Sequence, residues 1–113
     1  MRVNRKRIER RIVQQVIDDL LDVGFQLAVH DGEEFALKLC GNRKVILAAM
    51  FGTETDTLFA IAIGADGNPK YGGLVRFVYG NCPWEVIDDY TDNLAPILVR
   101  TLALVDAIEE QHL

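Results

Sequence analysis

Two runs of aspartates have a spacing that suits metal chemistry. The segments DDYTD at 88–92 and DDLLD at 18–22 both follow the pattern DDxxD. Carboxylates at this spacing can hold Mg²⁺ with a diphosphate when they line a deep cavity among long helices, and a chain of 113 residues lacks the length for one. We therefore interpret the run at 88–92 as acids at the start of the last helix, where negative charge is favourable. The run at 18–22 is interpreted as a solvated helix end, and no metal site is predicted.

Two other residues have side chains that could do chemistry. His30 precedes Asp31 and could act as a general base with an orienting carboxylate, but the sequence suggests no nucleophile or second acid beside it. Cys82 precedes Pro83 in a predicted turn, and its acidic surroundings disfavour a thiolate. We therefore predict no catalytic residue and no cofactor, and a protein that is not an enzyme.

Aromatic and acidic residues gather in the segment 79–94. It contains the single Trp and two of the three Tyr of the chain. Tyr and Trp dominate protein-binding hot spots, so an exposed cluster here would form an interface. The alternative is that the Trp plugs the core where the sheet meets the last helix. The protein-binding candidates are Tyr79, Trp84, Asp88, Asp89, Tyr90 and Asp92.

The first eleven residues form a basic arm on an acidic body. From residue 12 onward six basic residues stand against sixteen acidic ones. Cations at the start of a helix oppose its dipole, so we expect a compensating partner. Either the acidic end of the last helix, with Glu109 and Glu110, lies antiparallel beside them, or an external partner such as a nucleic acid phosphate does. The nucleic-acid candidates are Arg2, Arg5, Lys6, Arg7, Arg10 and Arg11.

Hydrophobic periodicity predicts the elements that position these residues. Residues 5–23 carry an apolar stripe at helical spacing, capped by Asn4 and ended by Gly24. Strands are expected at 25–30 and 35–39 around an Asp-Gly turn, and at 57–63 and 74–79. Asn42 can cap a short buried helix that runs to residue 51. The last helix is predicted from about 93 to 111, capped by Asp92 or Asn93, with Pro96 in its first turn.

This order predicts a single α+β domain over residues 1–113. An antiparallel sheet of four to five strands would carry the N- and C-terminal helices on one face, in the order α-β-β-α-β-β-(β)-α. The longest apolar run covers seven residues, 45–51, against the roughly 20 that a membrane span needs. Polar residues also interrupt what would be the apolar region of a signal peptide. We expect a cytoplasmic protein that starts at Met1 and does not bind membranes.

The segment VYGNCPWEVIDDYTDNL resembles a motif of small uncharacterised proteins encoded on plasmids, integrative elements and phages. Their pattern is close to VYGNxxWxVIxDYTxNL. The match is sharp over these residues and departs at Cys82-Pro83, where a looser turn is usual. The resemblance implies a bacterial mobile-element context and transfers no activity.

Three functions follow from these observations. The leading one is a non-enzymatic module that binds a host or element-encoded protein, as an inhibitor or regulator of that system. One alternative is nucleic-acid contact through the Arg-rich first helix. The other is a dimer similar to secretion chaperones, which are also small acidic α+β proteins. An uncovered edge strand would favour a homodimer.

Overall fold

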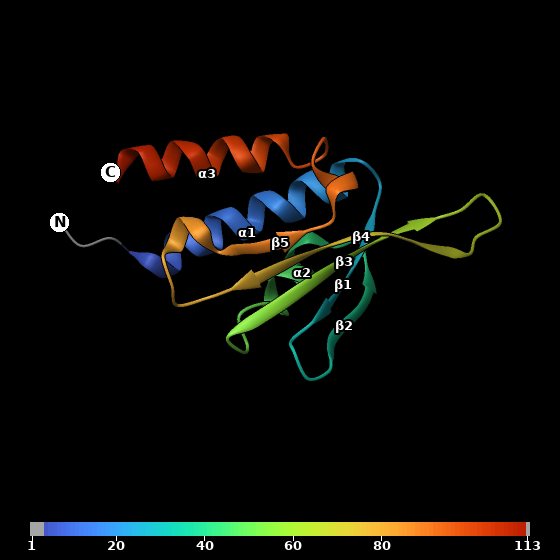
Figure 1. Cartoon of the computed structure of the whole chain (residues 1–113). Coiled ribbons are helices and arrows are strands. Elements are labelled where there is room, and N and C mark those ends of the chain that lie inside the picture. The colour runs from blue at the N-terminus through green and yellow to red at the C-terminus, as the bar shows by residue number, and fades with distance from the viewer. Residues whose placement is uncertain (1–3, 113) are drawn as a thin grey trace.

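The computed structural model describes residues 4–112 and confirms the predicted α+β architecture. Five strands form one antiparallel sheet in the order β2-β1-β3-β4-β5, and the N-terminal and C-terminal helices both lie on the same side of it (Figure 1). The elements are α1 (Arg5–Asp22), β1 (Gln26–His30), β2 (Phe35–Cys40), α2 (Arg43–Ala48), β3 (Thr55–Ile63), β4 (Pro69–Val78), η1 (Pro83–Glu85), β5 (Ile87–Tyr90), η2 (Asp92–Leu94) and α3 (Val99–Gln111), where η1 and η2 are single 3₁₀ turns.

The first two helices begin at the caps that the sequence predicts. The Asn4 side chain accepts a hydrogen bond from the backbone N–H of Arg7 at 3.1 Å. The Asn42 side chain accepts from the N–H groups of Lys44 and Val45 at 3.0 and 3.2 Å. Each asparagine thus satisfies backbone donors that have no partner within the helix.

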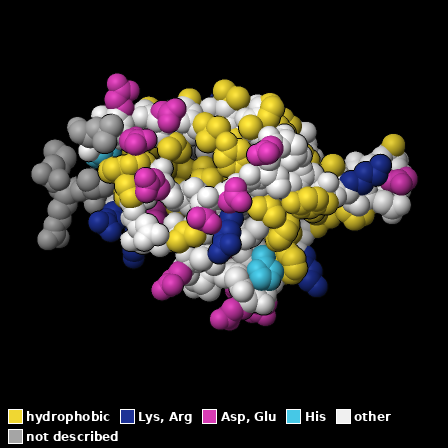
Figure 2. All heavy atoms as spheres, in the orientation of Figure 1, with side chains coloured by type: hydrophobic (Ala, Val, Ile, Leu, Met, Phe, Trp, Pro, Cys, Tyr) yellow, Lys and Arg dark blue, Asp and Glu magenta, His cyan; other side chains and the backbone are white. Residues whose placement is uncertain are grey.

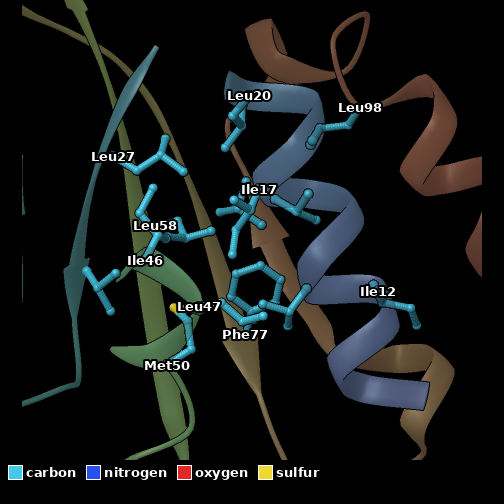
Figure 3. Packing of buried hydrophobic residues seen from close by; sticks show 14 of the residues in the cluster. Ile12, Ile17, Leu20, Leu27, Ile46, Leu47, Met50, Leu58, Phe77 and Leu98 are labelled. Carbon is cyan, nitrogen blue, oxygen red and sulfur yellow. The ribbon is translucent and has the colours of Figure 1, made fainter. Parts of the chain in front are cut away.

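Helices α1 and α2 pack on one face of the sheet and bury the core there, and α3 packs on the outer side against α1 and η1. Buried side chains of α1, such as Ile17 and Leu20, meet Ile46 and Leu47 of α2 and the inward residues of the strands (Figure 3). On β3 the inward residues are Leu58 and Ala60, both fully buried. The small alanine side chain lets a helix approach the sheet closely. Phe59 and Ile61 alternate with them and lie on the opposite, helix-free face.

The β3–β4 hairpin is longer than the sequence pattern indicates. β3 begins at Thr55, and β4 begins at Pro69 rather than at 74, so the hairpin projects from the body (Figure 1). The segment Tyr71-Gly72-Gly73 has no apolar alternation, but pairing with β3 holds it in a strand. A side chain at Gly73 would collide with Thr91 and Leu94, so glycine is required where the chain after β5 crosses β4.

The predicted start of the last helix is wrong by about six residues. Residues 92–94 form the 3₁₀ turn η2, and α3 begins only at Val99. Pro96 has no N–H with which to continue helical hydrogen bonding. Asn93 instead donates from Nδ2 to the Gly72 carbonyl at 2.5 Å, and the Leu74 N–H donates to the Thr91 hydroxyl at 3.1 Å. These bonds tie the segment to β4 before the helix can start.

The segment that follows β4 contains a helical turn and then a strand. Pro83–Glu85 form η1, which contacts α1 and α3, and Ile87–Tyr90 form β5, which pairs with β4.

Among residues 4–112, no helix has the length and hydropathy to cross a membrane.

Candidate binding surfaces

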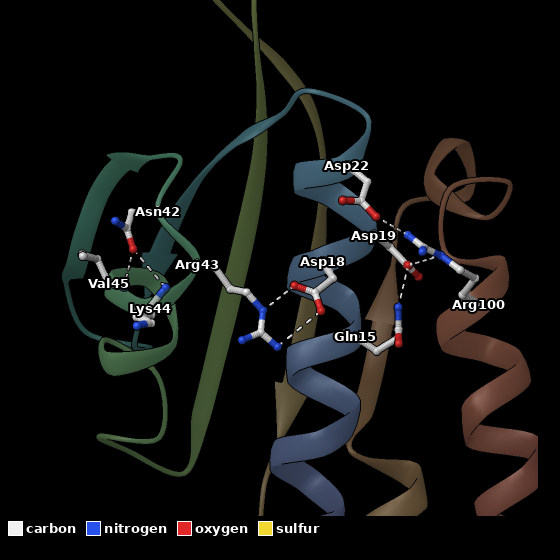
Figure 4. Close-up of polar contacts among 9 residues, drawn as sticks. All are labelled: Gln15, Asp18, Asp19, Asp22, Asn42, Arg43, Lys44, Val45 and Arg100. Atoms are coloured by element: carbon white, nitrogen blue, oxygen red, sulfur yellow. Dashed lines mark hydrogen bonds and ion pairs between the residues drawn. The ribbon is translucent and has the colours of Figure 1, made fainter.

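The aspartates at 18–22 connect three helices, which corrects their interpretation as a solvated helix end. Asp18 pairs with Arg43 of α2 at 2.5 Å, and Asp22 pairs with Arg100 of α3 at 2.5 Å (Figure 4). Asp19 is 1% exposed and lies 3.0 Å from Arg100. Its carboxylate also accepts from the backbone N–H and hydroxyl of Thr101 at 3.1 and 2.6 Å. Asp19 of α1 therefore caps α3, whose own N-cap residue, Leu98, has no side-chain cap.

The aspartates at 88–92 are exposed. The sequence interpretation placed them at the start of the last helix, but they do not begin it. Asp88 and Asp89 belong to β5, at the edge of the sheet, and Asp92 lies in η2. Asp88 approaches Arg76 at 3.6 Å, and an Asp89 oxygen accepts from the Tyr90 N–H at 2.8 Å. Charges on a short edge strand discourage pairing with another sheet. The aspartates at 18–22 pair with arginines of other helices, and those at 88–92 lie at the surface, so neither DDxxD run lines a cavity with carboxylates. Residues 4–112 contain no group of three or more His, Cys, Asp or Glu that could hold a metal ion.

The predicted aromatic candidates are half-buried and have separate surroundings. Trp84 packs against the core, and its ring stacks on His112 with centroids 5.4 Å apart. Tyr90 sits opposite Val75 in the β4–β5 pair and also packs against the core. Tyr79 stacks on Phe77 at a centroid distance of 6.5 Å. None of these three rings stacks on another of the three, so they do not form one aromatic cluster in the described chain.

Tyr79 anchors a buried carboxylate. Its hydroxyl donates to Oδ2 of Asp56 at 2.6 Å, and the Phe51 N–H donates to the same oxygen at 2.8 Å. Asp56 is 1% exposed, and its Oδ1 meets no donor within residues 4–112. Burial raises the pKa of Asp56, against the opposing effect of these two hydrogen bonds. Burial and the bond to Asp56 also raise the pKa of the Tyr79 hydroxyl.

His30 and Asp31 are both engaged in the β1–β2 turn. The Gly32 N–H donates to Nδ1 of His30 at 3.1 Å, and Asp31 accepts from the N–H groups of Glu33 and Glu34, each at 2.9 Å. These two bonds lower the pKa of Asp31. The carboxylate therefore holds the turn rather than orienting the imidazole. Cys82, also singled out by sequence, is a free, half-buried cysteine before η1.

The basic residues at the start of α1 are exposed and lack the partner that the last helix was expected to supply. Helix α3 does run antiparallel to α1 (Figure 1). However, its ion pairs in the described chain join Arg100 to Asp19 and Asp22 at the other end of α1. No carboxylate of residues 4–112 lies within 4.0 Å of the basic groups in this set, and Arg2 is outside the described residues. The exposed set is Arg5, Lys6, Arg7, Arg10 and Arg11.

A cleft of about 280 Å³ opens beside this basic set. Lys6 and Arg10 of α1 line it, together with the rings of Phe51 and Tyr79. Glu9 also lines it, is 5% exposed and accepts from the Gly80 N–H at 2.9 Å. A wider depression that shares Lys6, Glu9 and Tyr79 continues toward Arg5. The sequence pattern shows the arginines but gives no signal that loop residues near 51 and 79 meet them.

A row of aromatic side chains crosses the helix-free face of the sheet. Phe35 lies 4.9 Å from His30 and 5.8 Å from Phe59, and Phe59 lies 6.5 Å from Tyr71, measured between ring centroids. Phe35 is 49% and Tyr71 is 61% exposed. Leu39, Phe59 and Ile61 line a shallow groove in the same face. Figure 2 shows hydrophobic side chains at the surface near the base of the projecting hairpin. Sequence reasoning overlooked this face, although the second apolar side of 57–63 was its signal.

Comparisons of the chain with protein-family models, curated proteins and solved structures gave no match. The functional argument therefore rests on the geometry of this chain.

Proposed function

We propose that the protein is a non-enzymatic binding module that docks a partner chain on the helix-free face of its sheet. The aromatic row of His30, Phe35, Phe59 and Tyr71 is the observation that supports this proposal. Antiparallel sheets with one covered face normally present polar residues on the other face, where water solvates them. This face is instead apolar over several strands, a pattern typical of protein interfaces.

The composition of the face suits a protein partner. Aromatic residues supply large contact areas at a small cost in side-chain entropy and are enriched in hot spots. The groove between Phe35 and Phe59 is also lined by Ala28 and Leu39, and among residues 4–112 Lys38 is the one charged residue that lines it. A partner would therefore bring apolar side chains to the centre and water-exposed polar groups to the rim. Asp88 and Asp89 lie on β5, at one edge of the sheet, whereas the groove lies near β2, at the other edge.

A double variant and a control variant test the face. Phe35→Asp/Tyr71→Asp places two charges on the face, whereas Val99→Asp places one charge outside it, on an apolar residue of α3 that is 60% exposed. Sedimentation of the wild type as a dimer, lost in the double variant and kept in the control, would identify a second copy as the partner.

A photo-crosslinking residue at position 71 tests whether the partner is a different protein instead of a second copy of this chain. In cells it should trap a defined protein that the same residue at position 99 does not trap. A monomeric wild type with no crosslink specific to position 71 would remove the proposed function.

A further inference from the structure

The basic end of α1 and its adjoining cleft form a second site, made of residues other than those of the aromatic face. Lys6 and Arg10 lie four residues apart in α1, so they project from the same side of the helix, and both line the cleft. Arg7 and Arg11 have the same spacing but do not line it. Lys6 and Arg10 therefore line the cleft, whereas Arg7 and Arg11 do not. The fifth cation, Arg5, lines the adjoining depression and donates a hydrogen bond to the Gly80 carbonyl. Figure 2 shows Lys and Arg side chains gathered beside the start of α1.

Charge is layered in the cleft. Lys6 and Arg10 are exposed and form the rim, whereas Glu9 is almost completely buried behind them. One Glu9 oxygen already accepts from the Gly80 N–H at 2.9 Å. A small anion would be attracted by the rim and repelled by the inner carboxylate. A ligand that fits both layers carries its negative charge at the rim and an uncharged group inside.

The inner wall suits a flat apolar group. The rings of Phe51 and Tyr79 line the cleft, with centroids 4.9 Å apart and planes tilted by 40°. The hydrogen bond from Tyr79 to Asp56 holds one of these rings in place. Aromatic side chains bind bases by stacking, whatever the base, because each base has a π-face.

The rim cations have no internal role that would account for them. Lys6 stands in the first turn of α1, near the positive end of the helix dipole, and no carboxylate of residues 4–112 lies within 4.0 Å of Lys6 or Arg10. A bound phosphate would offset both the mutual repulsion of these two cations and the conflict of Lys6 with the dipole. A long nucleic acid strand would lie against the strongly acidic rest of the chain, which disfavours it.

We propose that this cleft binds a nucleotide, with its phosphate at Lys6 and Arg10 and its base against Phe51 and Tyr79. The same chemistry can come from a free nucleotide or from the phosphorylated 5′ end of a nucleic acid strand. The proposal does not depend on the aromatic face of the sheet.

Titration calorimetry on two matched double variants tests the site. Lys6→Gln/Arg10→Gln and Arg7→Gln/Arg11→Gln each remove two charges from the same helix end and keep a good helix former. ATP and AMP should bind the wild type. Loss of two charge-assisted hydrogen bonds should weaken ATP binding at least about tenfold in the first variant. The second variant should weaken it only about twofold, through long-range attraction.

Three further probes separate the parts of the ligand. Adenosine lacks the phosphate, and pyrophosphate lacks the base, so each should bind more weakly than ATP. In NMR spectra, ATP should shift the ring protons of Phe51 and Tyr79, and pyrophosphate should not. A short oligonucleotide with a 5′ phosphate that binds more tightly than AMP would identify a strand end as the source, and the reverse order a free nucleotide. Equal weakening of ATP in the two variants, or no binding of any nucleotide at millimolar concentration, would overturn the proposal.

Discussion

The two ends of α1 carry the same electrostatic conflict and resolve it differently. Both place charges against the helix dipole, acids at the C-terminal end and cations at the N-terminal end. At the acidic end, Asp18, Asp19 and Asp22 each pair with an arginine of another helix. At the basic end the cations face water and a cleft. The comparison teaches that unfavourable charge placement marks structural contacts where partners exist in the chain, and a candidate ligand site where they do not.

The largest effect is expected at the acidic end, from Asp19→Ala. This change removes the acceptor of the Thr101 N–H and hydroxyl and a partner of Arg100 and Gln15. Buried donors without acceptors cost about 1–3 kcal/mol each, so we expect a loss of roughly 3 kcal/mol in the free energy of unfolding. Urea denaturation measures it. Asp22→Ala, at a carboxylate that is mostly exposed, should lose less than about 1 kcal/mol. Equal losses of unfolding free energy in the two variants would contradict the stabilising role of the buried hydrogen bonds to Asp19.

A second prediction contrasts Asp19 with the other buried aspartate. Asp56 has two donors, no cation beside it and a raised pKa. A carboxyl whose pKa is higher in the folded than in the unfolded state adds stability below its unfolded pKa, and this stability is lost as the pH rises through the folded pKa. Asn at position 56 cannot titrate. The free energy of unfolding of Asp56→Asn minus that of the wild type should therefore decrease as the pH is lowered from 7 to 4.

Paired urea denaturation series at pH 4, 5, 6 and 7 give that difference. Taking it between two proteins cancels the contributions of the other carboxylates, including Asp31 and Asp66, whose lowered pKa values act in the opposite direction. A constant difference across this range would show that Asp56 titrates alike in the folded and unfolded states.

The smallest expected effect, of opposite sign to that of Asp19→Ala, is at the basic end. Arg7 is the third helical residue after the cap Asn4, so Arg7→Glu creates a capping box and replaces a cation near the dipole's positive end. We expect a gain of about 0.5–1 kcal/mol in the free energy of unfolding, measured by thermal and urea denaturation. Arg11→Glu lies beyond the first turn and should change it by less. A destabilised Arg7→Glu protein would mean that Arg7 already has a partner.

Much of the fold follows from short-range pattern. The α1 stripe and the Asn4 and Asn42 caps depend on residues within a few positions of one another, and the structure agrees with each. The candidate sites were harder to predict. The arginines of α1 could be named, but the Phe51 and Tyr79 rings reach their cleft through loops and strand ends far along the chain. The aromatic face was visible only as the second apolar side of one strand.

The sequence by itself therefore determined the order of the main helices and strands and the starts of the first two helices, because periodicity and caps act over one or two turns. Tertiary structure decided which charges are internal and where α3 begins. The bond from the Thr101 N–H to Asp19 joins residues 82 positions apart, and no local pattern encodes that distance. It also decided that the basic end of α1 keeps its charge exposed, because no carboxylate of residues 4–112, Glu109 and Glu110 of α3 included, lies within 4.0 Å of its basic groups.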